Sequence, residues 1–181
     1  MSSDQKRWEA LRWLEKSKDT LALVGGILSV IQPELYTLGV QALKRLRDNP
    51  SYCKDQDHLI EVLKRWYAPF SGIAIISNRS TPLHRDTGGR PQWLDFLIAV
   101  GEYEHGRFEV PGLGLRFKYN AGTAIAFSGK IFQHGANCVG NRACIAFYMR
   151  DLVLDRLGLP VGTWLDTSQY QALWGENAFK V

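Results

Sequence analysis

Residues 93–128 read WLDFLIAVGEYEHGRFEVPGLGLRFKYNAGTAIAFS, and this stretch decides the fold class. Its short apolar, β-branched and aromatic runs are separated by the turn signals Pro111-Gly112, Asn120-Ala-Gly122 and Ser128-Gly129. The runs predict strands at Trp93 to Val100, Arg107 to Val110, Leu115 to Tyr119 and Thr123 to Ser128. Many short strands joined by turns are typical of an antiparallel sandwich or barrel.

Two further strands are predicted outside this stretch, at Gly72 to Ser77 and at Arg142 to Arg150. In the second of them, alternation sends Ile145, Phe147 and Met149 to one face, which we expect to lie beneath helices.

The chain before residue 70 is helical in pattern. Helices are predicted from about Asp4 to Lys16, from Pro33 to just before Asn49, and from about Asp57 to Tyr67. The predicted fold is therefore α+β, with a jelly-roll core at about 69–155 braced by N-terminal helices at about 1–68. A tail at 156–181 completes one domain of 181 residues.

Composition excludes several classes of protein. Hydrophobic residues make up 45% and charged residues 22%, as in ordinary soluble domains. We expect no membrane span, because no apolar run reaches roughly 18 residues. Cys53, Cys138 and Cys144 are an odd number without a Cys-x-x-Cys pair, so neither a disulfide framework nor a structural zinc site is expected. These features predict an intracellular protein.

The net charge of +4 permits a polyanionic partner without requiring one. The excess of basic residues lies in the first 50 positions. Two interpretations remain open here, a nucleic-acid-binding face and a merely solvated helix surface.

The pattern His84-x-Asp86, followed by His134, is typical of a metal site. Two imidazoles and one carboxylate can occupy one face of Fe(II) and leave the opposite positions open, as in non-haem iron oxygenases. If the segment is extended, His84 and Asp86 point the same way and Arg85 points away. A single histidine is more often a core residue than a ligand, so the prediction depends on the whole set.

Arg142 completes the set as a cation for the far carboxylate of 2-oxoglutarate. The turn residues 137–141 predict a hairpin about Cys138, which would place Arg142 opposite His134. Arg150 lies eight residues further, roughly 26 Å along a strand, so we expect only one arginine at the site and favour Arg142. Cys144 shares its face and would pack beside the cosubstrate.

The stretch Ser77-Asn-Arg-Ser-Thr-Pro-Leu-His-Arg-Asp-Thr-Gly-Gly89 resembles the fungal-type TET/JBP dioxygenases, which oxidise methyl groups on nucleic-acid bases. The resemblance covers roughly residues 68–155, with a weaker likeness at Gly25–Pro33. It continues through Trp93–Asp95, Val100–Tyr103, Pro111–Gly114, Tyr119–Gly122, Gln133–Gly135 and Ala146–Asp151.

This resemblance implies a double-stranded β-helix that uses Fe(II), 2-oxoglutarate and O2. By motif position, the metal ligands are His84, Asp86 and His134, and the 2-oxoglutarate clamp is Arg142. The loop from Gly88 to Asp95 borders the substrate pocket.

The substrate contacts that the resemblance implies are Gly88, Gly89, Asp95 and Arg79. Asp95 would accept a hydrogen bond from an exocyclic base amine; alternatively it caps a turn or pairs with an arginine. Asn78 and Arg79 lie at the rim, where they would touch cosubstrate, base or phosphate; alternatively they make a structural turn contact.

The implied reaction is oxidation of 5-methylcytosine to 5-hydroxymethylcytosine and further, and N6-methyladenine demethylation is a second possibility. The partner would be methylated duplex DNA with a flipped base, in the nucleus, and RNA is not excluded. Two other hypotheses stay open, a hydroxylase of a protein or small molecule and a catalytically silent binding module. The chain lacks the cysteine-rich zinc-binding region of large animal members, which leaves its mode of duplex binding open.

Overall fold

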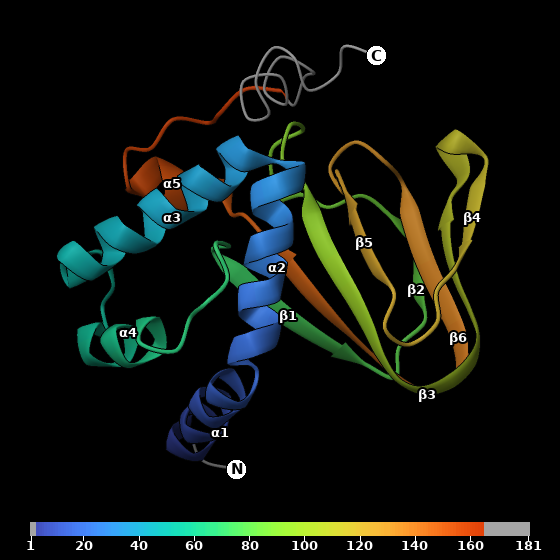
Figure 1. Ribbon diagram of the computed structural model, residues 1–181, viewed down its shortest axis with the longest axis horizontal. Coiled ribbons are helices and arrows are strands. Elements are labelled where there is room, and N and C mark those ends of the chain that lie inside the picture. The colour runs from blue at the N-terminus through green and yellow to red at the C-terminus, as the bar shows by residue number, and fades with distance from the viewer. Residues whose placement is uncertain (1–2, 165–181) are drawn as a thin grey trace, which may run out of the picture.

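The computed structural model describes residues 3–164, and Figure 1 shows helices gathered on one side and strands on the other. The α+β class is therefore confirmed. The helices are α1 (Ser3–Lys16), α2 (Lys18–Ile31), α3 (Pro33–Asp48), α4 (Gln56–Leu63) and α5 (Asp151–Arg156), with short 3-10 turns at Pro50–Tyr52 and Pro111–Leu113. No helix within 3–164 combines the length and the apolar character needed to cross a bilayer.

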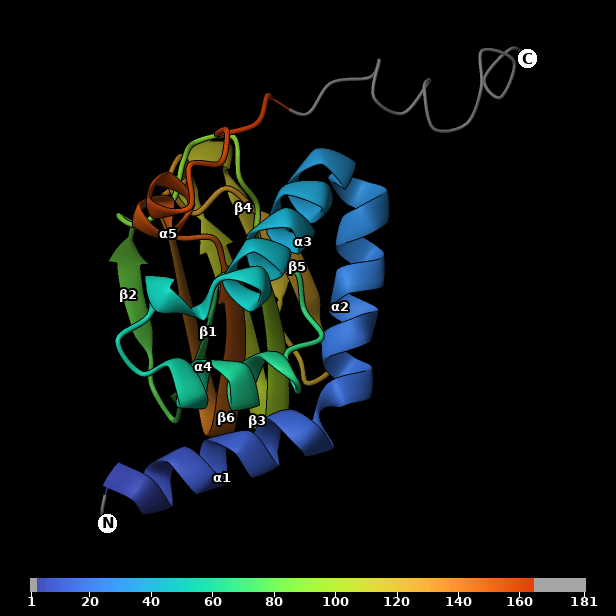
Figure 2. The same cartoon turned by 90° about the vertical axis from the view of Figure 1, so that its left-hand side faces the viewer.

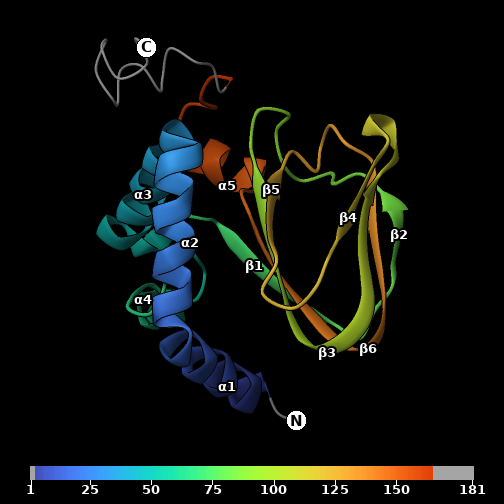
Figure 3. The same ribbon diagram turned by 45° about the vertical axis from the view of Figure 1, so that its right-hand side comes forward.

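The strands form one antiparallel sheet of six members. They are β1 (Gly72–Ser77), β2 (Thr81–His84), β3 (Asp95–Val110), β4 (Leu115–Lys118), β5 (Ala124–Phe127) and β6 (His134–Tyr148). The long strands β3 and β6 pair along most of their length and curve together (Figure 3). β5 and β4 pair with the two ends of β3, and β1 and β2 pair with the two ends of β6. This folded-over sheet is the predicted double-stranded β-helix.

The prediction of a hairpin about Cys138 is wrong, because β6 runs through this segment without reversing. β3 hydrogen-bonds to β6 on both sides of the expected turn, with Glu104 opposite Val139 and Arg107 opposite Asn137. Gly140 has a φ of +114° within the strand, and the pairing register shifts between Glu104 and Arg107. The turn-forming residues therefore bend the strand instead of reversing it.

The two predicted strands at Trp93–Val100 and Arg107–Val110 are likewise one strand, β3. The polar stretch around His105 lies inside β3 at the register shift, where His105 has a φ of 53°. The other short predicted strands correspond to β1, β4 and β5 with small differences at their ends.

The helices cover one face of the sheet (Figure 2). Leu21, Leu28 and Leu35 from α2 and α3 share a buried cluster with Phe96 of β3 and Phe147 of β6. The prediction that Ile145, Phe147 and Met149 lie beneath the helices is confirmed, since Phe147 and Met149 belong to this cluster and Ile145 packs against it. A second cluster inside the barrel contains Ala99, Phe108, Val110 and Tyr119.

Helix α2 has no counterpart among the predicted helices. Its glycines, Gly25 and Gly26, lower intrinsic helix propensity, so the sequence favoured no helix there. Gly25 is buried, and a Cβ on it would lie 3.0 Å from Cδ of Pro69, so close packing accounts for one glycine. The helix predicted to reach Tyr67 ends at Leu63. Most of the predicted tail, from residue 165 onward, lies outside the described residues.

Candidate active site

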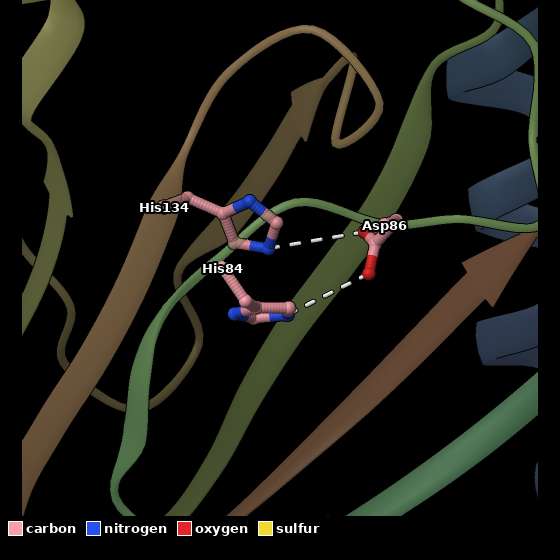
Figure 4. A group of neighbouring side chains, drawn as sticks. All are labelled: His84, Asp86 and His134. Carbon is pink, nitrogen blue, oxygen red and sulfur yellow. Dashed lines mark ion pairs between the residues drawn. The ribbon is translucent and has the colours of Figure 1, made fainter.

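His84, Asp86 and His134 meet in the barrel, with their ligand atoms all within 4.8 Å of one another (Figure 4). Nε2 of His84 lies 3.5 Å from Oδ1 of Asp86, and Nε2 of His134 lies 3.8 Å from Oδ2 of the same carboxylate. The two histidines are directly opposite each other on β2 and β6. The partner of His134 across the strands is therefore His84, and Arg142 instead faces Gly101.

Both imidazoles are oriented by backbone carbonyls two residues earlier. Nδ1 of His84 lies 2.9 Å from the carbonyl oxygen of Pro82, and Nδ1 of His134 lies 3.0 Å from that of Phe132. Because a carbonyl only accepts, Nδ1 carries the proton and Nε2 of the neutral ring keeps its lone pair. Burial lowers the pKa of His134, which further favours the neutral, metal-binding form.

Gly129 joins Asp86 to Asp95. The backbone N–H of Asp86 donates to the carbonyl of Gly129 at 2.9 Å, and the N–H of Gly129 donates to Oδ2 of Asp95 at 3.2 Å. A Cβ on Gly129 would lie 2.2 Å from Oδ2 of Asp86, so only glycine leaves both carboxylates in place. Burial raises the pKa of Asp95 to about 7, and the nearby Asp86 carboxylate adds to this shift.

A cavity of about 290 Å³ contains this cluster and extends along the inward face of β6. Arg142 lines it and is only 2% exposed, with its guanidinium 5.5 Å from the centre of the Tyr119 ring. Nη2 of Arg142 donates to the carbonyl of Arg79 at 2.8 Å, whereas Nε has no hydrogen-bond partner among the described residues. No carboxylate in residues 7–164 forms an ion pair with it. A buried cation in this state favours an anionic ligand.

Arg150 lines the same cavity, so the expectation of a single arginine at the site is wrong. Arg142, Cys144, Ala146 and Tyr148 of β6 all line the cavity, which continues past the end of the strand to Arg150. Unlike Arg142, Arg150 is exposed. Its guanidinium lies 4.6 Å from the centre of the Tyr148 ring.

The other predicted site residues fall into two groups. Gly88, Gly89, Asp95 and Cys144 line the cavity, and the hydroxyl of Tyr119 is 3.5 Å from Sγ of Cys144. The cavity lining among the described residues does not include Asn78 or Arg79, which lie behind Arg142 and contact it.

Two residues important for the site were not identified from the sequence. Gln32, 2% exposed between α2 and α3, donates to the carbonyl of Gln92 at 2.7 Å and accepts from the N–H of Leu94 at 3.2 Å. It thereby fixes the loop from Gly88 to Asp95. Tyr119, fully buried, supports Arg142. Gln32 lies in the segment Gly25–Pro33, and the weaker family resemblance of that segment is the sequence signal that could have identified it.

The residues present fit an Fe(II) ion and a dicarboxylate cosubstrate. Two neutral imidazole nitrogens and one carboxylate on neighbouring segments are a donor set suited to non-haem iron. Arg142 lines the same cavity, and its guanidinium, whose Nε has no partner among the described residues, is a donor group suited to a carboxylate.

The family comparison agrees with this chemistry. The family model Tet_JBP, described as the oxygenase domain of the 2OGFeDO superfamily, matches residues 2–151. Among solved structures, NgTET1 in complex with 5mC DNA is similar at 13% identity and a TM-score of 0.44. That alignment covers 82% of this chain and 59% of the NgTET1 chain, so this chain spans less than two thirds of its length. None of the curated proteins matches the chain.

Proposed function

The chain belongs to the Tet_JBP oxygenase family, and we propose that its substrate is a methylated base in DNA. Enzymes of this superfamily use Fe(II), 2-oxoglutarate and O2. When bound together, these groups supply the oxidising power to convert a substrate C–H bond into C–OH. The chain's own residues hold the groups, orient them and select the substrate.

We assign the metal to His84, Asp86 and His134. Their carbonyl-anchored imidazoles and the Asp86 backbone bond to Gly129 hold the donors in place before a metal arrives. Such preorganisation limits the entropy that binding costs.

We assign the distal carboxylate of 2-oxoglutarate to Arg142. Its burial limits competition from water, and its Nε has no hydrogen-bond partner within the described residues. Cys144, two residues along the same face, would pack beside the carbon chain of the cosubstrate.

We assign the substrate base to the end of the cavity near Tyr148. Its aromatic ring is the candidate surface for base stacking, and Gly88 has no side chain to displace the Arg150 guanidinium that lies over this ring. Asp95 is the candidate acceptor for an exocyclic amine, and Arg79 the candidate rim contact. A cavity of about 290 Å³ admits a single base and not a duplex, so the base must leave the stack.

The observation that carries this proposal is the shared cavity of the three metal-ligating side chains and the buried, unpartnered Arg142. The nucleic-acid part of the proposal has additional support from the aromatic ring and the exposed arginine at the other end of that cavity.

The decisive experiment supplies the protein with Fe(II), 2-oxoglutarate and O2 and duplexes carrying 5-methylcytosine or N6-methyladenine. Nucleoside mass spectrometry then measures oxidised bases, and succinate is quantified in parallel. We expect hydroxymethylated product with the wild type and none with Asp86→Ala. Asp48→Ala, which removes an exposed helix carboxylate, is the matched control and should retain activity.

Other results would change the proposal in defined ways. Product formed equally well by Asp86→Ala removes the metal assignment. Succinate release that methylated duplexes do not stimulate, but that a protein or metabolite pool does, replaces DNA with that substrate class. A further reaction with methylated single-stranded RNA tests whether RNA is the substrate.

A further inference from the structure

Asn78 makes an unusual connection to Arg142 at the point where β1 ends. The backbone N–H of Asn78 donates to the carbonyl of Arg142 at 2.7 Å. In return, the backbone N–H of Arg142 donates to the side-chain Oδ1 of Asn78 at 3.0 Å. A regular antiparallel pair would use the backbone carbonyl of residue 78 for this second bond. The side-chain amide therefore replaces a backbone group in the ladder.

This replacement frees the backbone of Asn78 to turn. Its φ is 49°, in the left-handed region that asparagine tolerates better than most residues. The turn presents the next carbonyl, that of Arg79, to Nη2 of Arg142 at 2.8 Å. One asparagine thus fixes Arg142 at its backbone and, through its neighbour's carbonyl, at its guanidinium.

We propose that Asn78 is a positioning residue for Arg142, and that it serves cosubstrate binding without touching the cosubstrate. The inference rests on the proposed role of Arg142 as the carboxylate clamp. An arginine side chain has many rotamers, and a guanidinium fixed in advance loses less entropy when it binds an anion. Nε, the buried atom left without a partner, is then held in one position.

Three substitutions separate the effect of the Asn78 side-chain acceptor from the effect of its left-handed backbone. Asn78→Gly keeps the left-handed backbone accessible and removes the acceptor, together with the long Nδ2 bond to Oδ1 of Asn141 at 3.4 Å. Asn78→Asp keeps both the acceptor and tolerance of the left-handed region. Asn78→Ala loses both. His105 is the matched control, because it is the other non-glycine described residue with positive φ and is exposed at the bend of β3, so His105→Ala adds similar backbone strain elsewhere.

Binding is measured by anaerobic calorimetry, first with Mn(II) alone and then with 2-oxoglutarate added to the Mn(II)-loaded protein. We expect Asn78→Gly to raise the Kd for 2-oxoglutarate about tenfold and Asn78→Ala to raise it further, with Mn(II) affinity unchanged. Asn78→Asp should stay within about threefold of the wild type, and His105→Ala should match it. In the metal-free protein, exchange of the Arg142 amide hydrogen should accelerate in Asn78→Gly but not in His105→Ala.

The failures of the two ideas are distinguishable. If Arg142→Met weakens 2-oxoglutarate binding and Asn78→Gly does not, the positioning role is wrong and the clamp stands. If Arg142→Met leaves binding unchanged, the clamp itself is wrong. Equal losses of Mn(II) and 2-oxoglutarate affinity in Asn78→Gly would show general damage to the fold and would overturn the inference.

Discussion

Arg142 lies within β6 and Arg150 lies just beyond its end; both line the same cavity, but their environments are opposite. Arg142 is 2% exposed and is held by Asn78, by the carbonyl of Arg79 and by the ring of Tyr119. Arg150 is exposed and rests on the ring of Tyr148. One end of the cavity thus presents a buried guanidinium, and the other end presents an exposed one.

The difference shows how burial assigns different ligands to one residue type. A buried guanidinium with an unpartnered Nε is costly until an anion arrives, so Arg142 is suited to a small carboxylate that becomes fully enclosed. An exposed guanidinium keeps its hydration, and its attraction for anions is screened by salt. Arg150 is therefore suited to a phosphate that stays at the surface.

Replacement of Arg142 should give the largest effect. Arg142→Met keeps the buried volume but removes the cation, and we expect the Kd for 2-oxoglutarate to rise by about 100-fold or more, because a carboxylate would be left without its partner. Calorimetry on the Mn(II)-loaded protein measures this. Arg47→Met, on the exposed side of α3, should leave the Kd unchanged. An unchanged Kd in Arg142→Met would remove the distinction between the two arginines.

Replacement of Tyr148 should come next and should act on the substrate alone. Tyr148→Ala removes the ring at the cavity wall, and the loss of one base–aromatic stack predicts a fall of about tenfold in kcat/KM for methylated DNA. The Kd for 2-oxoglutarate should not change. Tyr67→Ala, at an exposed tyrosine on the helical side, is the control. Loss of 2-oxoglutarate binding in Tyr148→Ala would mean that the two ends of the cavity are not separate.

The sequence predicted that His84, Asp86 and His134 lie together, because local and strand geometry decide their proximity. His84 and Asp86 are two residues apart, and His134 stands opposite His84 once β2 pairs with β6. The assignment of Arg142 agreed with its position in the cavity, but the hairpin argument for it was wrong. Turn propensity at residues 137–141 is local, whereas the hydrogen bonds that keep β6 continuous come from β3, a distant part of the chain.

The environments of the two arginines could not be predicted either, because they also depend on distant parts of the chain. Alternation from residue 142 to residue 150 predicts both side chains on one face, but burial depends on what covers each end. Tyr119 comes from the loop after β4 and Asn78 from the end of β1, and only the folded sheet brings both to Arg142. Helix α2 was missed because its favourable packing against Pro69 is also a long-range property.

A smaller effect is expected at Arg150 itself. Arg150→Gln should weaken duplex DNA binding about threefold at moderate salt and reduce the slope of log K against log salt by about 1, as loss of one phosphate contact predicts. Fluorescence anisotropy over a salt series measures this. Arg12→Gln is the matched control, since Arg12 also lies over an aromatic ring, that of Trp8, but in α1. An equal change of slope in Arg12→Gln would mean that the helices also contact DNA phosphates.

The smallest effect is expected at Gly88, which lies against Arg150. A Cβ on Gly88 would be 1.9 Å from Nη1 of Arg150, the mobile end of a long side chain, so Gly88→Ala should displace the guanidinium at little cost in stability. Gly39→Ala is the opposite case, because its Cβ would be 1.9 Å from the backbone oxygen of Pro69, which cannot move independently. Thermal unfolding should therefore show a Tm shift of no more than about 2 °C for Gly88→Ala and a much larger fall for Gly39→Ala. With a stable fold, Gly88→Ala should reproduce part of the salt-slope change of Arg150→Gln and leave 2-oxoglutarate binding intact. If Gly88→Ala unfolds as easily as Gly39→Ala, Arg150 is as rigidly held as Arg142, and the contrast between the two ends of the cavity fails.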